Sequence, residues 1–159
     1  MKILIIYDTV YGNTEKIADA IQQEITKKHV AKLIKAKDVT LEDIRNTELL
    51  MVGSPTHGGR FTEPVKNFLN QIPNNELKIH AAAFDTSSDK ENQKTFVKAI
   101  IGFFGSAAPR IAKALARKGA NIIGAETFFV LGSEGPLKKG EVERAKVWGN
   151  LILEKALEK

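Results

Sequence analysis

Residues 7–21 of the chain read YDTVYGNTEKIADAI, and they join two structural patterns. An apolar run ends at Tyr7, and beyond Asn13 the residues Ile17, Ala18 and Ile21 recur at the spacing that places side chains on one face of a helix. The residues between are polar and rich in hydroxyl groups. The stretch therefore predicts a buried strand, a tight turn and an amphipathic helix in direct succession.

The turn in this stretch has the composition of a phosphate-binding site. Thr9, Tyr11 and Thr14 bring hydroxyl groups, Gly12 allows close approach of the backbone, and a helix that begins near Asn13 directs its free amides into the turn. The turn lacks the Gly-Lys pair of nucleoside-triphosphate loops and the three glycines of the dinucleotide fingerprint, so a single terminal phosphate fits best. An ordinary strand-to-helix turn, in which the threonines only cap the helix, is the alternative.

The 159-residue chain has the size and composition expected of one globular domain over residues 1–159. Hydrophobic residues make up 43% and charged residues 27% of it, and no apolar run approaches the ~20 residues of a membrane span. The lack of cysteine excludes disulfides, thiolate catalysis and cysteine-ligated metals. Because the first apolar run stops before Asp8, we expect no secretory signal and a cytoplasmic protein.

The net charge of +5 raises the question of a nucleic-acid partner. The lysines and arginines come in small groups, mixed with acidic residues along the predicted helices. This pattern is typical of a solvated surface and not of a binding stripe. We therefore expect neither nucleic acid nor a membrane as a partner.

Apolar runs alternate with helical patterns along the chain. Strands are predicted at residues 2–7, 49–53, 79–84 and 122–131, with a weaker, lysine-containing run at 31–36 that is typical of an edge strand. Five strands that alternate with helices predict a doubly wound parallel sheet of the α/β class. In such sheets a ligand binds beyond the carboxyl ends of the strands. The loops at residues 8–14, 54–62, 85–93 and 132–136 are therefore the candidate binding loops.

The helical patterns carry their own boundary signals. Pro64 suits the first turn of a helix, Gly119 is placed to cap another, and Thr40 with Asp43 indicates a short capped helix. Trp148 lies at a core position of the last helix, so we interpret it as a packing residue.

Residues 5–14, IIYDTVYGNT, together with Ala18 and Ile21, resemble the flavodoxin signature. The second loop, GSPTHGG at 53–59, and the third, FDTS at 84–87, are similar to the corresponding loops of that family. The resemblance implies a flavodoxin-like, five-stranded parallel sheet with strand order 2-1-3-4-5 in a three-layer α/β/α arrangement. It also implies that the ligand is FMN.

The resemblance assigns roles to the loops. The hydroxyls and amides of the first loop would hold the FMN phosphate, although Tyr11 departs from the threonine common in the family and is expected at the edge of the cofactor. The third loop would give backbone bonds to the flavin pyrimidine. The cofactor-binding residues implied in this way are Thr9, Val10, Tyr11, Gly12, Asn13, Thr14, Ser54, Pro55, Thr56, His57, Gly58, Gly59, Phe84, Asp85, Thr86 and Ser87.

The second loop and its neighbours raise two further expectations. In flavodoxins a carbonyl of this loop turns toward the flavin on reduction, and we assign that role to Gly58 because glycine allows the peptide to flip. His57 occupies the place where many family members put an aromatic ring, and it can carry charge near neutral pH. A phenylalanine that covers the other face is expected among Phe96, Phe103 and Phe104, and the sequence does not choose between them.

Two functions are compatible with these motifs. The first is an electron carrier that shuttles electrons between redox proteins, with no catalytic residue and no metal; its basic exterior would select partners with acidic docking surfaces. The second is an FMN-dependent enzyme that reduces a quinone or similar acceptor with a reduced nicotinamide. A phosphate-sensing receiver domain would need an acceptor aspartate after the third strand, where this chain has Gly53 and Ser54.

Overall fold

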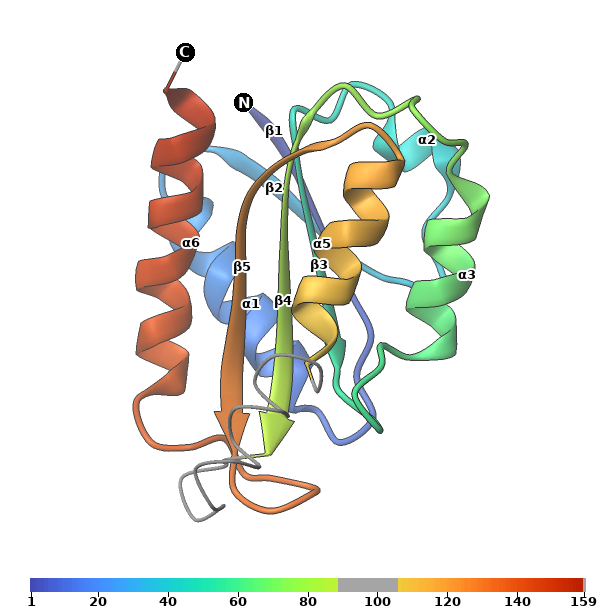
Figure 1. Cartoon of the computed structure of the whole chain (residues 1–159). Coiled ribbons are helices and arrows are strands. Elements are labelled where there is room, and N and C mark those ends of the chain that lie inside the picture. Colours follow the sequence, from blue (N-terminus) through green and yellow to red (C-terminus); the bar gives the residue numbers. More distant parts are fainter. Residues whose placement is uncertain (89–105, 159) are drawn as a thin grey trace.

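Five parallel strands form one sheet in the order β2-β1-β3-β4-β5 (Figure 1). The structure, a computed structural model, describes residues 1–88 and 106–158. The strands are β1 (Lys2–Tyr7), β2 (Val30–Lys35), β3 (Leu49–Pro55), β4 (His80–Ser88) and β5 (Asn121–Val130). The helices are α1 (Asn13–Ile25), α2 (Leu41–Ile44), α3 (Glu63–Gln71), α5 (Ala107–Arg117) and α6 (Glu141–Leu157). The predicted fold class and strand order are confirmed.

Helices cover both faces of the sheet, with α1 and α6 on one side and α3 and α5 on the other (Figure 1). Successive side chains of a strand point to opposite faces, so β1 divides its residues between the two layers. Ile3 and Ile5 pack in the cluster with α1 and α6, and Leu4 and Ile6 pack in the cluster with α3 and α5. Burial on both faces explains why β1 is a continuous apolar run.

The edge position of β2 is confirmed, because its only partner in the sheet is β1, within the part of the chain that the structure describes. Lys32 and Lys35 extend their ammonium groups to the surface, at 64% and 45% exposure of the side chain. Trp148 of α6 is buried and meets the rings of Phe84 and Phe128 edge-on, at centroid distances of 6.1 and 5.9 Å. Its predicted role in packing is therefore confirmed.

The boundary signals in the sequence also correspond to structure. Gly119 has a left-handed φ of +99° just beyond α5, as a helix cap requires. Thr40 and Asp43 form a reciprocal capping box at the start of α2. Pro64 lies in the first turn of α3.

Two strands extend farther than the apolar runs predicted. The runs end at residues 53 and 84, whereas β3 continues to Pro55 and β4 to Ser88. The extension occurs because the polar residues are still paired across the sheet, with Ser54 opposite Asp85 and Pro55 opposite Thr86. These pairs carry polar side chains to the carboxyl edge of the sheet, where the loops meet. Across the described residues, no helix is both long and apolar enough to cross a membrane.

Candidate functional site

The head of α1 presents backbone amides that lack an acceptor. α1 begins at Asn13 and has no side-chain cap, and its first internal bond runs from Lys16 N to Gly12 O at 3.1 Å. Within residues 1–88 and 106–158, the amides of Asn13, Thr14 and Glu15 have no hydrogen-bond acceptor, although Asn13 and Thr14 are 7% and 1% exposed. Open amides at a helix N-terminus, together with the positive end of the helix dipole, favour anion binding, so this helix end is suited to receive an anion.

The head of α5 provides the contrast. Its first amide, Ala107 N, donates to Thr56 Oγ1 at 2.8 Å, and Ala108 N donates to Asp85 Oδ2 at 3.0 Å. The chain itself therefore satisfies this helix end, whereas it leaves the head of α1 open.

Gly12 shapes the entrance to the α1 amides. It precedes the helix at φ +86°, a left-handed conformation that favours glycine. A Cβ atom placed on Gly12 would meet no atom within 4 Å, so the space that a side chain would occupy is open. Gly12 N donates to Thr9 Oγ1 at 3.0 Å, which closes the turn from within. The first-loop amides were predicted to bind the phosphate, but the Gly12 amide is already hydrogen-bonded to Thr9.

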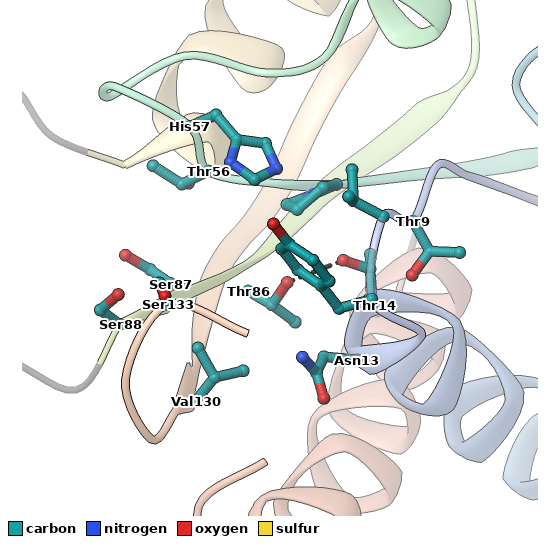
Figure 2. A pocket seen from close by; sticks show the side chains of 13 residues that line it. Thr9, Asn13, Thr14, Thr56, His57, Thr86, Ser87, Ser88, Val130 and Ser133 are labelled. Atoms are coloured by element: carbon teal, nitrogen blue, oxygen red, sulfur yellow. Dashed lines mark hydrogen bonds between the residues drawn. The ribbon is translucent and has the colours of Figure 1, made fainter. Parts of the chain in front are cut away.

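Two hydroxyls meet beneath the turn. Thr14 Oγ1 and Thr86 Oγ1 lie 2.7 Å apart, and both residues are buried (Figure 2). One hydrogen bond uses only one of the two hydroxyl hydrogens, so the other is available for a ligand. The contact also joins the first helix to the end of β4. The sequence analysis had placed these two threonines in separate loops.

The second loop is a tight turn with two glycines at its tip. His57 and Arg60 exchange backbone hydrogen bonds at 3.0 Å, and Gly58 and Gly59 between them have φ of +55° and +75°. Positive φ at both central positions is the geometry of the type I′ turn, which glycine adopts without strain. A Cβ atom on Gly58 would meet nothing within 4 Å. Gly58 itself is exposed, so the tip of this turn faces solvent on at least one side.

A buried polar cluster anchors this loop. Thr56 Oγ1 donates to Asp85 Oδ2 at 2.8 Å, and Ser106 Oγ donates to the same oxygen. Asp85 is fully buried, and its other oxygen has no partner among the described residues. Ser54 Oγ accepts from Thr62 N at 3.0 Å, which fixes the return of the loop toward α3.

These elements enclose a cavity at the carboxyl edge of the sheet (Figure 2). Its volume is about 30 Å³, whereas one water molecule needs ~10–15 Å³. It therefore holds a small polar group and not a whole cofactor. Ten of the predicted residues line it, namely Thr9, Val10, Tyr11, Asn13, Thr14, Pro55, Thr56, His57, Thr86 and Ser87.

Six predicted residues lie outside the lining. Gly12, Gly58 and Gly59 lie in the adjacent turns. Ser54 and Asp85 support the second loop by hydrogen bonds to Thr62 and Thr56. The ring of Phe84 is fully buried against Trp148. Because β4 is paired on both sides through Phe84 and Asp85, their backbone groups belong to the sheet, and Ser87 at the strand end is better placed for a ligand.

One wall of the cavity is formed by residues that were not among the predicted cofactor-binding residues. Ser88, Val130 and Ser133 line the site, and Ser133 lies in the loop after β5. That loop is tied to the head of α1 by Asn13 Nδ2, which donates to Glu134 O at 3.0 Å. The loop at residues 132–136 was among the candidate binding loops because it follows a strand end, but none of its residues was assigned to the cofactor. Phe96, Phe103 and Phe104 lie outside the described residues.

The chemistry of the cavity fits a phosphate group. Among the described residues that line it, none is Lys, Arg, Asp or Glu, and hydroxyls predominate. An anion there would be held by fixed dipoles: the open amides of α1, the hydroxyls and the positive end of the helix. Tyr11 is 51% and Val10 53% exposed, and with His57 they form a partly apolar rim against which a planar group can lie. The fold and site together define a doubly wound α/β protein whose first turn could hold a phosphate group.

Comparisons with known proteins agree with this description. The family model described as "Flavodoxin domain" matches residues 4–129. A flavodoxin of Aquifex aeolicus is 34% identical over 79 residues, which cover 45% of this chain and 40% of the relative. An NAD(P)H dehydrogenase (quinone) of Methylocella silvestris is 27% identical over 127 residues, covering 63% and 64%. The chain thus spans between 40% and 64% of the length of these two relatives.

The solved structures show the same fold. A flavodoxin from the domain Archaea superposes with a TM-score of 0.75 at 23% identity, and the match covers 98% of this chain and 99% of that one. The chain belongs to the flavodoxin family. Membership of the family implies a flavin cofactor.

Proposed function

We propose that this protein is a cytoplasmic FMN-binding electron carrier that passes electrons between redox proteins. The observation that carries the proposal is the head of α1, where the amides of Asn13, Thr14 and Glu15 have no acceptor within the described part of the chain. A phosphate monoester satisfies them, and FMN differs from riboflavin by this group. The match to the flavodoxin domain family supports a flavin as the rest of the ligand.

The residues of the site have distinct roles in this proposal. FMN, when bound, supplies reversible electron uptake and release. The α1 amides and the Thr14–Thr86 hydroxyl pair hold the phosphate, and Gly12 keeps the approach open. Tyr11 and His57 limit where the ring lies, because both side chains are at the exposed rim of the cavity.

The second loop responds to the charge of the flavin. The peptide between Gly58 and Gly59 has glycine on both sides and Gly58 is exposed, so this peptide turns at low cost to offer its carbonyl. Asp85 holds Thr56, at the base of this loop, in place during that motion. A protonated His57 would favour the reduced, negatively charged flavin.

A carrier needs partners, and the basic surface argues for acidic ones. With a net charge of +5, the chain attracts proteins of opposite charge over about one Debye length of ~8 Å. We propose that the redox partners dock through acidic surfaces. The alternative, a nicotinamide-dependent quinone reductase, rests on the similarity to the quinone dehydrogenase of Methylocella silvestris.

The proposal is tested by ligand discrimination and turnover. Purified apoprotein should bind FMN at least about tenfold more tightly than riboflavin, since the charged hydrogen bonds to a phosphate contribute ~1.5–3 kcal/mol each. The FMN-loaded protein should exchange electrons with redox proteins and show little turnover with NADPH and a quinone. Equal affinity for the two flavins would contradict the phosphate site, and rapid quinone turnover would favour the enzyme.

A further inference from the structure

A second, larger cavity is lined by residues of α3, α5 and the loops beside them. Both helices lie on the face of the sheet away from α1 and α6 (Figure 1). The volume of this cavity is about 810 Å³. Six cationic residues line this cationic groove, and they are Arg60, Lys66, Arg110, Lys113, Arg117 and Lys118. Among the described residues that line it, Glu63 is the only acid.

Four of the six cations in the groove have no ion-pair partner in the part of the chain that the structure describes. Lys66 forms an ion pair with Glu63 at 3.7 Å. Arg60, Lys113, Arg117 and Lys118 form no ion pair with any residue in 1–88 or 106–158. Some cations elsewhere are paired within one helical turn, as Lys27 is with Glu24 and Lys146 with Glu143. The groove differs because six cations gather around one cavity with a single acid among the described residues that line it.

The arrangement of the cations is regular along α5. Lys113 and Arg117 are four residues apart, so they project from the same face one turn apart, about 6 Å along the axis. Like charges at this spacing destabilise a helix by ~0.2–0.5 kcal/mol per pair. A helix surface that keeps such a pair exposed is suited to meet a negatively charged partner.

The groove is continuous with the candidate flavin site. His57 lines both cavities, and Arg60 follows it across the glycine turn into the groove. A partner that occupies the groove would therefore extend to the rim where the flavin ring is proposed to lie.

The side chains favour a protein partner over a small ligand. Lys113 and Arg117 are exposed, and the half-buried Phe61 and Ala114 contribute apolar surface between the helices. A small-molecule site fixes its ligand with a few precisely placed polar groups in an enclosed pocket. Long, solvated cations around an open groove instead match a carboxylate-rich protein segment, and such charge pairs mainly accelerate association.

We propose that the cationic groove is the docking site for an acidic segment of the redox partner, which brings the partner's own redox centre to the His57 rim. The inference rests on the proposed carrier function. Lys113, Arg117 and Arg60 pair with carboxylates of the segment, while the half-buried Phe61 contacts its apolar side chains.

The first test measures binding of a fluorescent oligoglutamate peptide to the FMN-loaded protein. Lys113→Glu combined with Arg117→Glu should weaken binding at low salt by at least about tenfold, because like charges would then face each other. The matched control is Lys28→Glu combined with Lys37→Glu, which changes the net charge equally at exposed positions without ion pairs to described residues. This control should bind the peptide like the unmodified protein.

The second test measures electron transfer from the reduced protein to an acidic ferredoxin. The groove variant should transfer electrons at least about tenfold more slowly than the control variant at low salt, and the difference should shrink at about 0.15 M salt. Both variants should retain the FMN stoichiometry of the unmodified protein. If the unmodified protein, the groove variant and the control variant all failed to hold FMN, the proposed function would fail. Peptide binding would still show whether the groove docks an acidic segment.

Three outcomes would overturn the docking proposal. Equal weakening in the two variants would show that only net charge matters. Unchanged peptide affinity and an unchanged electron-transfer rate in the groove variant would show that α5 takes no part in docking. Tighter binding of a single-stranded oligonucleotide than of oligoglutamate, lost in the groove variant alone, would assign the groove to nucleic acid.

Discussion

Gly12 is the residue on which the phosphate site depends most directly. Gly12→Val would place a branched side chain in the open space before α1 and force it into a left-handed conformation. We expect FMN affinity to fall by at least about a hundredfold, and stability to fall by ~1–3 kcal/mol from backbone strain. Flavin fluorescence quenching and urea unfolding measure the two effects separately.

Gly140 offers a matched control for this prediction. It precedes α6 at φ +90°, and a Cβ atom there would also meet nothing within 4 Å. Gly140→Val should therefore cost similar stability and leave FMN affinity unchanged. If both variants lost FMN equally, strain and not the approach to α1 would explain the loss.

Thr14 and Thr86 form a pair whose coupling can be measured. Thr14→Val leaves the buried Thr86 hydroxyl without its partner, which should cost the apoprotein ~1–3 kcal/mol. Adding Thr86→Val should recover much of that loss, because neither hydroxyl is then left unpaired. A double-mutant cycle by urea unfolding gives the coupling energy. Strictly additive losses would show that the hydroxyls are independent.

At the scale of elements, the start of α6 is joined to the end of β5 by Glu141. This buried carboxylate accepts hydrogen bonds from Phe129 N at 2.7 Å and from Arg144. Burial acts to raise the pKa of Glu141, but the hydrogen bonds from Arg144 and Phe129 and the charge of Arg144 outweigh it, so the pKa lies below its ordinary value. The ionised carboxylate is therefore the form that stabilises the fold.

This depressed pKa predicts a pH dependence with a definite sign. The stabilisation is present above the unfolded value of about 4.3 and is lost as the pH falls from there through the folded pKa. Glu141→Gln should lower stability at neutral pH by ~1–3 kcal/mol and flatten its fall between about pH 5 and 3. Glu143→Gln, at an exposed position in the same turn, should leave the fall of stability with decreasing pH as it is in the unmodified protein. Unfolding curves measured across this range would distinguish the two variants.

Elements differ in how well the sequence predicted them. β1 was predicted with its observed bounds, because burial on both faces leaves one unbroken apolar run. β3 and β4 were predicted too short, because their last residues are polar and are kept in the sheet by pairing and by the cluster around Asp85. Local hydrophobicity does not record such pairing. The capping box of α2 was predicted because its two residues are three positions apart.

The candidate site shows the same limit over a longer range. Its first loop is contiguous in sequence, so its hydroxyls, glycine and helix start were recognised together. The loop after β5 was a candidate binding loop, but its contact with the first turn was not predicted, because the hydrogen bond from Asn13 to Glu134 joins residues 121 positions apart. The function of Asp85 as an anchor for Thr56 was likewise invisible, since it depends on where α5 begins.

The distribution of charge over the whole molecule predicts a response to salt. Lys113 and Arg117 repel each other on α5, and screening relieves this cost. Raising the salt concentration to about 0.5 M should therefore stabilise the apoprotein by ~0.2–0.5 kcal/mol from this pair. Lys113→Glu makes the interaction with Arg117 attractive, so added salt should then weaken this pair's contribution to stability. Lys28→Glu should leave the salt effect from the Lys113–Arg117 pair unchanged. An identical salt response in all three proteins would contradict this reading of the groove.

Both chain ends described by the structure lie at the edge of the sheet opposite the candidate site (Figure 1). The nine residues of β4 that separate the edges span about 30 Å. A protein fused genetically to either end would leave the flavin rim uncovered. For such a fusion partner to reach the rim on average, a flexible glycine-serine tether of about 30 residues is required. Shorter tethers would hold the two redox centres apart, so tether length becomes a means of adjusting the rate of electron exchange within one polypeptide.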